Sequence, residues 1–357
     1  NSTDDIKHFL NDNSFKKVFI ICGKKSFITS GGEKFFKDLL TNKKIKYFYK
    51  NSNFPILDEL IEIINDIRNF QPDLLLAIGG GAIIDYGKMA NVVENKNNLK
   101  NLIINYSYPF KEKYTKLAVI PTTAGSGAEV TSNAVIYVDG VKHSFESEIL
   151  KPDNFFLIPE FLISAPNTIK ASAGFDAIAQ ALESLVSKKS DNESVEYASK
   201  SLRVSINSYI SFLNNPNIKN ATEMSIAANL AGKAISISKT TAPHAVSYPF
   251  TSLFNISHGH AVSLFFENFF QYNYDNLDRA ETNFNFTKRF ELIFKLLEVN
   301  NIHQFKKKIS YIKNQAKLEC NLKNLNININ SNAERIIKGI NLLRLGNNPI
   351  KIDENEI

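Results

Sequence analysis

Cysteine is scarce in this chain: Cys22 and Cys320 are the only two among 357 residues. Two cysteines can build neither a framework of several disulfides nor a zinc site of the cysteine type. Such scarcity is typical of a protein from a reducing compartment. It also means that a metal site here must use carboxylate, amide or imidazole ligands.

Long hydrophobic runs are missing as well. The apolar run at 18–22 is far shorter than the roughly 20 residues that a membrane-spanning helix needs. The sequence begins with Asn1, and no charged and then apolar leader follows. We therefore expect no membrane span and a cytoplasmic location.

A strong charge imbalance is also absent, because 42 Lys and Arg against 36 Asp and Glu leave a formal net charge of only +6. The lysines are scattered through polar stretches such as 95–100 and 304–308, and no basic arm with interleaved aromatic residues is present. We expect no nucleic-acid partner and interpret most of the surplus charge as a solvated surface.

What remains is an ordinary globular composition with enough length for two domains. Over 1–155, short β-rich runs alternate with amphipathic stretches. This alternation predicts an α/β domain with a doubly wound, Rossmann-like parallel sheet, which binds ligands beyond the carboxyl ends of its strands. The expected strands are 18–21, 45–49, 74–78 and 117–120, and the expected helices are 31–40, 56–70 and one that begins near 83.

The second domain, over 156–357, is expected to be all-helical. Long periodic stretches rich in Ala, Ser and Leu replace the β-branched runs there. They predict helices over 173–187, 194–213, 222–237 and 288–299.

Two glycine-rich turns follow predicted strands. Gly79, Gly80, Gly81 and Ala82 lie between a strand and a helix, where backbone N–H groups and the helix N-terminus can bind a pyrophosphate. The turn at 121–131 offers the hydroxyls of Thr122, Thr123, Ser126 and Thr131. Two such turns favour a dinucleotide over a mononucleotide, although plain turns without a ligand remain the alternative.

The turn after the first strand bears on the choice of coenzyme. It contains Gly23 followed by Lys24 and Lys25, with no acid to bind the adenosine 2′-hydroxyl. This pattern favours NADP(H) and leaves NAD(H) open.

A set of metal-ligand types lies in the helical domain. Asp176 and Gln180 are four residues apart and so share one helix face. His244, His258 and His260 fall within 17 residues. A carboxylate with two imidazoles and open positions is a site for Zn²⁺ or Fe²⁺ acting as a Lewis acid. Hydrogen-bonded core histidines are the alternative.

Together these motifs resemble the iron-containing (group III) alcohol dehydrogenase superfamily over nearly the whole chain. They are GGGAIIDYGK at 79–88, PTTAGSGAE at 121–129, GFDAI at 174–178, and His244 followed fourteen residues later by His258. The resemblance implies the fold shared with dehydroquinate synthase and a homodimer. It further implies a divalent metal in the cleft between the domains that polarises a carbonyl while a nicotinamide delivers hydride.

The resemblance also assigns residues. It puts the metal ligands on Asp176, Gln180, His244 and His258, with Gln180 where the family usually has histidine. An amide is a weaker ligand than imidazole, which leaves open a site of three strong ligands, a preference for zinc, or a metal-poor site. The implied coenzyme residues are Gly80, Gly81, Asp85, Thr122, Thr123, Ser126 and Lys142.

Within the superfamily, the stretches 176–184, 228–234, 239–249 and 341–349 resemble the phosphonoacetaldehyde reductase branch. Such an enzyme would reduce phosphonoacetaldehyde to 2-hydroxyethylphosphonate. Lys233 and Lys239 are candidates to bind the phosphonate, with plain surface lysines as the alternative. The catalytic proton would come from water at the metal or from His260.

Three other functions stay open. The first is a general primary-alcohol, butanol-type or polyol dehydrogenase, which would also act on a small aldehyde or alcohol. The second is a lyase resembling dehydroquinate synthase, although no comparable cluster of basic residues is found. The third is a binding protein that kept the fold without the chemistry.

Overall fold

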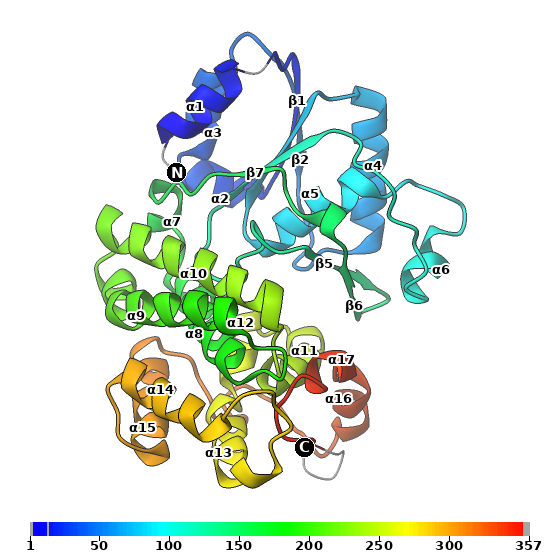
Figure 1. Ribbon diagram of the computed structural model, residues 1–357. Coiled ribbons are helices and arrows are strands. Elements are labelled where there is room, and N and C mark those ends of the chain that lie inside the picture. The colour runs from blue at the N-terminus through cyan, green and yellow to red at the C-terminus, as the bar shows by residue number, and fades with distance from the viewer. Residues whose placement is uncertain (1–2, 13, 353–357) are drawn as a thin grey trace. The chain divides into compact units, whose positions relative to one another are not determined.

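The computed structural model describes residues 3–12 and 14–352 (Figure 1). Its contacts divide the chain into two compact units. The first unit contains Asn1–Thr123 and Ala128–Ala165, and the second contains Ala124–Gly127 and Pro166–Ile357. No helix of the described residues is both long enough and apolar enough to cross a membrane.

The first unit is built on a parallel sheet of five strands, in the order β2-β1-β3-β4-β7. Their bounds are β1 (Lys17–Cys22), β2 (Lys44–Tyr49), β3 (Leu74–Gly79), β4 (Lys116–Pro121) and β7 (Asn154–Phe155). The central strands are almost wholly buried, which explains why their sequences are continuous apolar runs rather than alternating ones. The predicted doubly wound sheet is therefore confirmed.

The helices of the first unit pack on this sheet or on its connections. They are α1 (Thr3–Asp12), α2 (Lys24–Thr29), α3 (Gly32–Leu39), α4 (Leu57–Phe70), α5 (Gly81–Val92), α6 (Leu99–Ile104) and α7 (Glu160–Ile163), with a 3₁₀ turn at Glu148–Leu150. The core lies where apolar side chains of α4 and α5 meet β1, β3 and β4. Leu60, Ile63 and Ile67 recur at helical spacing and are fully buried there.

A two-stranded antiparallel hairpin in the first unit was not predicted. Its strands are β5 (Asn133–Val138) and β6 (Val141–Glu146), joined at Asp139 and Gly140, which both have positive φ. The fully buried Lys88 of α5 fixes the start of the hairpin, donating to the Thr131 carbonyl at 2.9 Å and the Asn133 carbonyl at 2.8 Å. The two-residue Asp-Gly turn is a hairpin signal that the sequence did carry.

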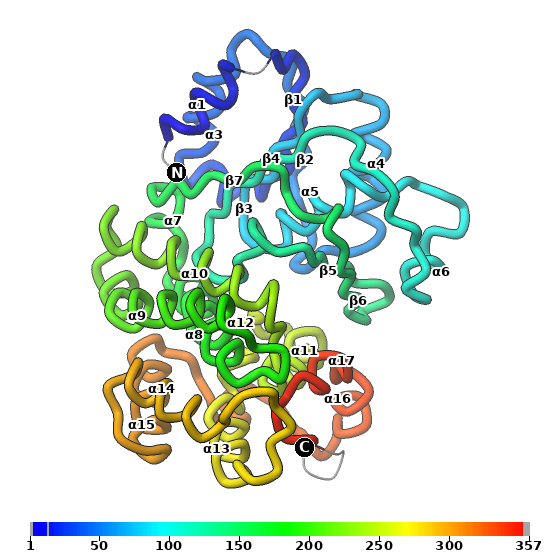
Figure 2. The backbone as a smooth tube through the Cα atoms, in the orientation of Figure 1, coloured from blue at the N-terminus to red at the C-terminus, as the bar shows by residue number. Residues whose placement is uncertain are grey.

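Regular structure in the described part of the second unit is helical throughout, as predicted. The helices are α8 (Asn167–Val186), α9 (Asn192–Asn214), α10 (Ile218–Ser238), α11 (Ala242–Phe254), α12 (His258–Ser263), α13 (Phe266–Asp275), α14 (Phe286–Leu297), α15 (Ile302–Gln315), α16 (Ala333–Gly339) and α17 (Leu342–Leu345), with a 3₁₀ turn at Leu277–Arg279. In Figure 2, α8, α9 and α10 lie side by side, and the structure has extensive contacts among the three.

Helix α8 is the central helix of the second unit and is buried from residue 170 onward except at Ala173. It begins at Asn167, directly after Pro166, and therefore earlier than the predicted start at 173. Small residues such as Ala177, Ala179 and Ala181 allow neighbouring helices to approach closely. One face of this helix carries the polar residues of the candidate site.

Candidate metal site and nucleotide-binding turns

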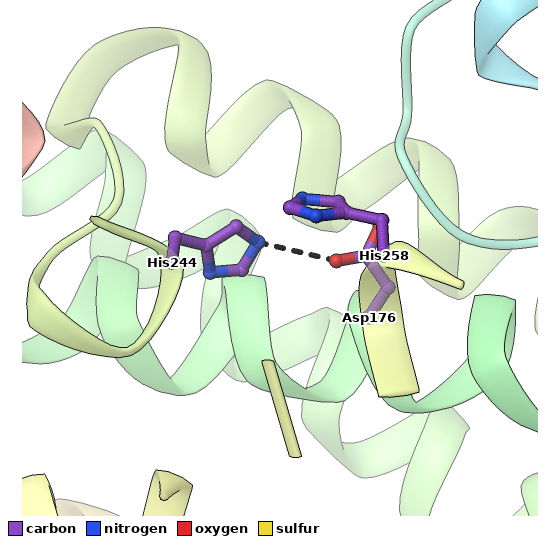
Figure 3. A group of neighbouring side chains, drawn as sticks. All are labelled: Asp176, His244 and His258. Atoms are coloured by element: carbon purple, nitrogen blue, oxygen red, sulfur yellow. Dashed lines mark hydrogen bonds and ion pairs between the residues drawn. The ribbon is translucent and has the colours of Figure 1, made fainter. Parts of the chain in front are cut away.

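Three side chains from three helices of the second unit meet at one point. Asp176 comes from α8, His244 from α11, and His258 is the first residue of α12 (Figure 3). One potential ligand atom of each lies within 4.8 Å of the others, and His244 Nε2 lies 3.1 Å from Asp176 Oδ1. Asp176 and His244 are buried and His258 is half-buried. A carboxylate and two imidazoles so placed can hold a divalent metal ion.

A glycine brings α12 against α8. A Cβ atom on Gly259 would lie 2.0 Å from the Ser172 carbonyl oxygen and 2.8 Å from Asp176 Cβ. No larger residue fits without moving one helix. Because Gly259 follows His258 directly, this close approach also carries His258 to Asp176.

A fourth polar side chain tests whether these residues fit a metal. The Gln180 amide nitrogen donates to Asp176 Oδ2 at 3.0 Å, while its buried amide oxygen has no hydrogen-bond partner among the described residues. A buried acceptor without a donor is costly. A cation would satisfy it, so the group of carboxylate, imidazoles and amide fits a divalent metal such as Zn²⁺ or Fe²⁺.

The charges of the group are tightly coupled. Burial lowers the pKa of His244, but Glu183 and Asp176 outweigh burial and raise this pKa to about 10. Burial raises the pKa of Asp176, but His244 and His258 outweigh it and hold the pKa below its usual value. In the metal-free protein, the raised pKa favours the protonated, positively charged form of His244 beside the two carboxylates, where a metal ion would otherwise supply the positive charge.

The predicted nucleotide-binding turns of the first unit lie at the carboxyl edge of its sheet. Cys22, Ile78 and Ile120 are aligned on neighbouring strands β1, β3 and β4. The turns beginning at Gly23, Gly80 and Thr122 follow these strands. The strand order reverses direction between β1 and β3, which is where doubly wound sheets bind nucleotides.

Contacts between two of these turns are direct. The Thr122 N–H donates to the Gly79 carbonyl at 3.0 Å, and a Cβ on Gly80 would lie 3.3 Å from Thr123 Oγ1. Gly80 is the N-cap of α5, with Gly81 and Ala82 in its first turn. The N–H groups of this first turn are thus held beside the threonine hydroxyls, an arrangement suited to phosphate.

The remaining predicted coenzyme residues lie close to these turns or belong to the second unit. Asp85 Oδ2 accepts from the Val135 N–H at 3.2 Å. Burial raises its pKa to about 6, against the opposing effect of Lys88, the Val135 N–H and Lys142. Ser126 falls in the second unit, next to Gly127, whose φ is +59° and whose Cβ would lie 2.4 Å from Gly232 Cα.

Comparison with family models decides the family. Residues 1–159 match the model described as iron-containing alcohol dehydrogenase, and residues 170–357 match the C-terminal model of the Fe-containing alcohol dehydrogenase family. The chain belongs to the iron-containing alcohol dehydrogenase family. The predicted superfamily is thereby confirmed.

Individual relatives are more distant. The 4-hydroxybutyrate dehydrogenase of Clostridium kluyveri is 29% identical over 224 residues, which make up 61% of this chain and 60% of that protein. The phosphonoacetaldehyde reductase of Streptomyces viridochromogenes is 25% identical over 228 residues, 61% of this chain and 57% of that protein. The chain thus matches about three-fifths of the length of these relatives.

Solved structures agree in fold. The sulfoacetaldehyde reductase of Bifidobacterium kashiwanohense, crystallised in complex with NAD⁺, superposes with a TM-score of 0.88 at 23% identity. The match covers 99% of this chain and 92% of that one. At this identity the likeness shows the fold alone.

Three residues predicted to act in proton transfer or phosphonate binding are not part of the group formed by Asp176, His244 and His258. His260 Nε2 is 2.7 Å from the Glu319 carbonyl oxygen. Lys233 Nζ lies 5.7 Å from the centre of the Tyr197 ring, and Lys239 Nζ donates to the Ser236 carbonyl at 2.5 Å. The roles predicted for His260, Lys233 and Lys239 stay predictions.

One polar residue of the site was missed at the sequence level. Glu183 is fully buried on α8 and pairs with His244 Nδ1. It follows Asp176 by seven residues, so the two share one helix face with Gln180. This spacing was the available signal, but a glutamate on a helix is normally read as solvent-exposed.

Proposed function

We propose that this chain is a metal-dependent, NAD(P)H-linked reductase of a small aldehyde, and that phosphonoacetaldehyde is its substrate. The observation that carries the proposal is the meeting of Asp176, His244 and His258, completed by the buried, unsatisfied amide oxygen of Gln180. When bound, the metal would polarise the carbonyl oxygen, and the reduced nicotinamide would supply hydride.

The chain's own residues would serve three tasks. Asp176, His244 and His258 would hold the metal, and the turn at Gly79–Gly81 would bind the pyrophosphate of the coenzyme. His260 would pass a proton to the product oxygen. Its Nε2–H donates to the Glu319 carbonyl, so Nδ1 has the free lone pair in the neutral ring, and the proton that His260 passes on would be one taken up at Nδ1.

Two observations support the proposal that the substrate is an anion: the substrates named in the relatives, and two lysines of this chain. Phosphonoacetaldehyde and sulfoacetaldehyde, named in the relatives described above, are both two-carbon aldehydes with a strongly acidic group. Lys233 and Lys239, at the end of α10 and just before α11, are the cations proposed to bind the phosphonate.

A panel of aldehydes tests the substrate. We expect kcat/KM for phosphonoacetaldehyde to exceed that for butanal and for glyceraldehyde at least about tenfold, which is about 1.4 kcal/mol of discrimination. Equal turnover of butanal would contradict the phosphonate assignment and favour a general alcohol dehydrogenase. No turnover of any aldehyde by metal-loaded protein would favour a binding protein.

Matched lysine variants test the phosphonate contacts. Lys233→Met and Lys239→Met should raise KM for phosphonoacetaldehyde and leave KM for butanal unchanged, because only the anion needs the ammonium group. Lys219→Met removes an exposed lysine from the start of the same helix and serves as the control. Equal KM values for all three variants would overturn this part of the proposal.

The coenzyme preference is proposed as NADP(H). Cys22 at the end of β1 is paired with Tyr49 at the end of β2, and Lys24 Nζ lies 6.0 Å from the Tyr49 ring. A cation at these strand ends favours a 2′-phosphate. We expect kcat/KM to be higher with NADPH than with NADH, and Lys24→Ala to lower that ratio. A preference for NADH would contradict the proposal.

A further inference from the structure

Glu183 is a buried carboxylate with an unusually complete set of donors. Its side chain is fully buried on α8. Oε1 accepts from the Thr241 N–H at 2.9 Å, the Thr241 hydroxyl at 3.0 Å and the His244 N–H at 3.3 Å, and Oε2 pairs with His244 Nδ1. A buried charge is tolerated only when it is satisfied in this way. All of these donors belong to two residues at the start of α11.

The start of α11 depends on this carboxylate. Thr241 is the N-cap but does not cap the helix with its own side chain, and Pro243 contributes no N–H to the first turn. The His244 N–H therefore needs an acceptor from outside the helix, and Glu183 provides it. The positive end of the helix dipole in turn favours the carboxylate. These contacts fix the position of His244 along α8.

The contact with Nδ1 sets the proton of the imidazole. An ionised carboxylate can only accept hydrogen bonds, so His244 Nδ1 must carry a proton. In the neutral ring, Nε2 is then the atom with a free lone pair. This is the atom that lies 3.1 Å from Asp176 Oδ1, inside the metal-ligand group.

We propose that Glu183 is a positioning residue of the metal site: by accepting from His244 Nδ1 and from the start of α11, it holds the imidazole in the tautomer and orientation that bind a metal through Nε2. It acts through His244 and is not itself a ligand. The inference rests on the proposed metal site and is independent of the proposed substrate.

Glu183→Gln tests the inference with little change in volume. The amide keeps one acceptor but places an N–H₂ group in the carboxylate's site. If that group faces Nδ1, the ring must move its proton to Nε2, where it blocks the metal. Loss of such partners of ligating histidines lowers metal affinity by roughly 10- to 100-fold. The measurement is Zn²⁺ affinity by competition with a chromophoric chelator, without substrate or coenzyme.

Cobalt gives a spectroscopic readout of the same site. Co²⁺ bound to the unchanged chain should give visible absorption bands that shift or weaken in Glu183→Gln, because the geometry at His244 changes. A role of Glu183 in folding alone would lower stability without moving these bands.

Glu267→Gln is the matched control. Glu267 is also a buried glutamate of the second unit, paired with the Lys313 ammonium at 2.6 Å and with Ser310. Its removal should lower Tm and leave Zn²⁺ affinity and the Co²⁺ spectrum unchanged. An equal loss of metal affinity in both variants would overturn the inference, as would unchanged affinity in a folded Glu183→Gln protein.

Two further outcomes separate the inference from the proposed function. If Glu183→Gln does not fold, Glu183→Asp keeps the charge at a shorter reach and should still weaken Zn²⁺ binding measurably, because the shorter side chain no longer meets His244 Nδ1 in the same position. Unchanged affinity in that variant would overturn the inference. If the unchanged chain binds neither Zn²⁺ nor Co²⁺, the proposed function and the inference both fail. Normal binding with no aldehyde turnover contradicts only the proposed function.

Discussion

Single residues determine whether the side chains of Asp176, His244 and His258 can meet to form a metal site. Asp176 and Glu183 meet His244 from one face of α8, so the imidazole is held on both of its nitrogens. His258 reaches the same point because Gly259 allows α12 to lie against α8. Close packing at Gly259 thus positions His258, and charge pairing with Asp176 and Glu183 positions His244.

Gly259→Ala should separate His258 from Asp176. The added Cβ would meet the Ser172 carbonyl, a backbone atom that cannot rotate away, so we expect about 1–3 kcal/mol loss of unfolding free energy. Zn²⁺ affinity should fall with it. Gly346→Ala, where the added Cβ would lie 3.3 Å from the Leu342 carbonyl and away from the metal site, should leave Zn²⁺ affinity unchanged. Wild-type Zn²⁺ affinity in Gly259→Ala would contradict this reading of the packing.

The charge state of His244 predicts how stability depends on pH. Its pKa in the folded, metal-free protein is about 10, above the value of about 6.5 in an unfolded chain. His244 therefore contributes stability that is fully present below about pH 6.5 and is lost as pH rises through about 10. The Tm of the metal-free protein should fall over this interval, and less so in Glu183→Gln.

Zn²⁺ affinity should rise over the same interval, because the metal needs the neutral ring. Titrations of the metal-free protein at a series of pH values measure this. Zn²⁺ affinity that is independent of pH would show that His244 is not a ligand.

At the scale of elements, the C-terminal segment supports α11. Pro249 lies inside this helix and cannot donate to the Ala245 carbonyl, and the Asn341 N–H donates to that carbonyl instead at 3.3 Å. Asn347 donates to the Thr240 carbonyl at 3.1 Å, just before the helix begins. The stretch 341–349, noted at the sequence level for its resemblance, thus braces the helix that carries His244.

Asn347→Ala should weaken this support. It leaves the Thr240 carbonyl without its buried donor, which costs about 1–3 kcal/mol. Chemical denaturation measures the loss. Asn324→Ala removes an exposed asparagine that bonds to Glu319 and should change stability by less than about 0.5 kcal/mol. Equal effects of the two substitutions would contradict the bracing role.

Some elements could be predicted from the sequence and others could not. The strands β1, β3 and β4 are buried on both faces, so their apolar runs stand out. Helix α11 is interrupted by Pro249 and α12 is only six residues long, so neither shows a clear periodicity. His244 and His258 were predicted as ligands from their spacing and the family resemblance, not from their helices.

At the scale of the whole chain, the fold and the family could be predicted from motif order. The role of Glu183 could not, because a buried glutamate is recognisable only once its partners at Thr241 and His244 are placed. The phosphonate contacts of Lys233 and Lys239, the coenzyme preference and the implied homodimer stay predictions. Light scattering of the purified chain tests the dimer, which a monomeric mass would contradict.

The central claim is that the group of Asp176, His244 and His258 holds a metal needed for aldehyde reduction. The most direct test follows NADPH oxidation by phosphonoacetaldehyde in protein as purified, after chelation, and after Zn²⁺ or Fe²⁺ is restored, with metal content measured in parallel. We predict loss of activity on chelation and recovery at about one metal per chain, with neither metal nor activity in Asp176→Asn. Full activity in metal-free protein would contradict the account.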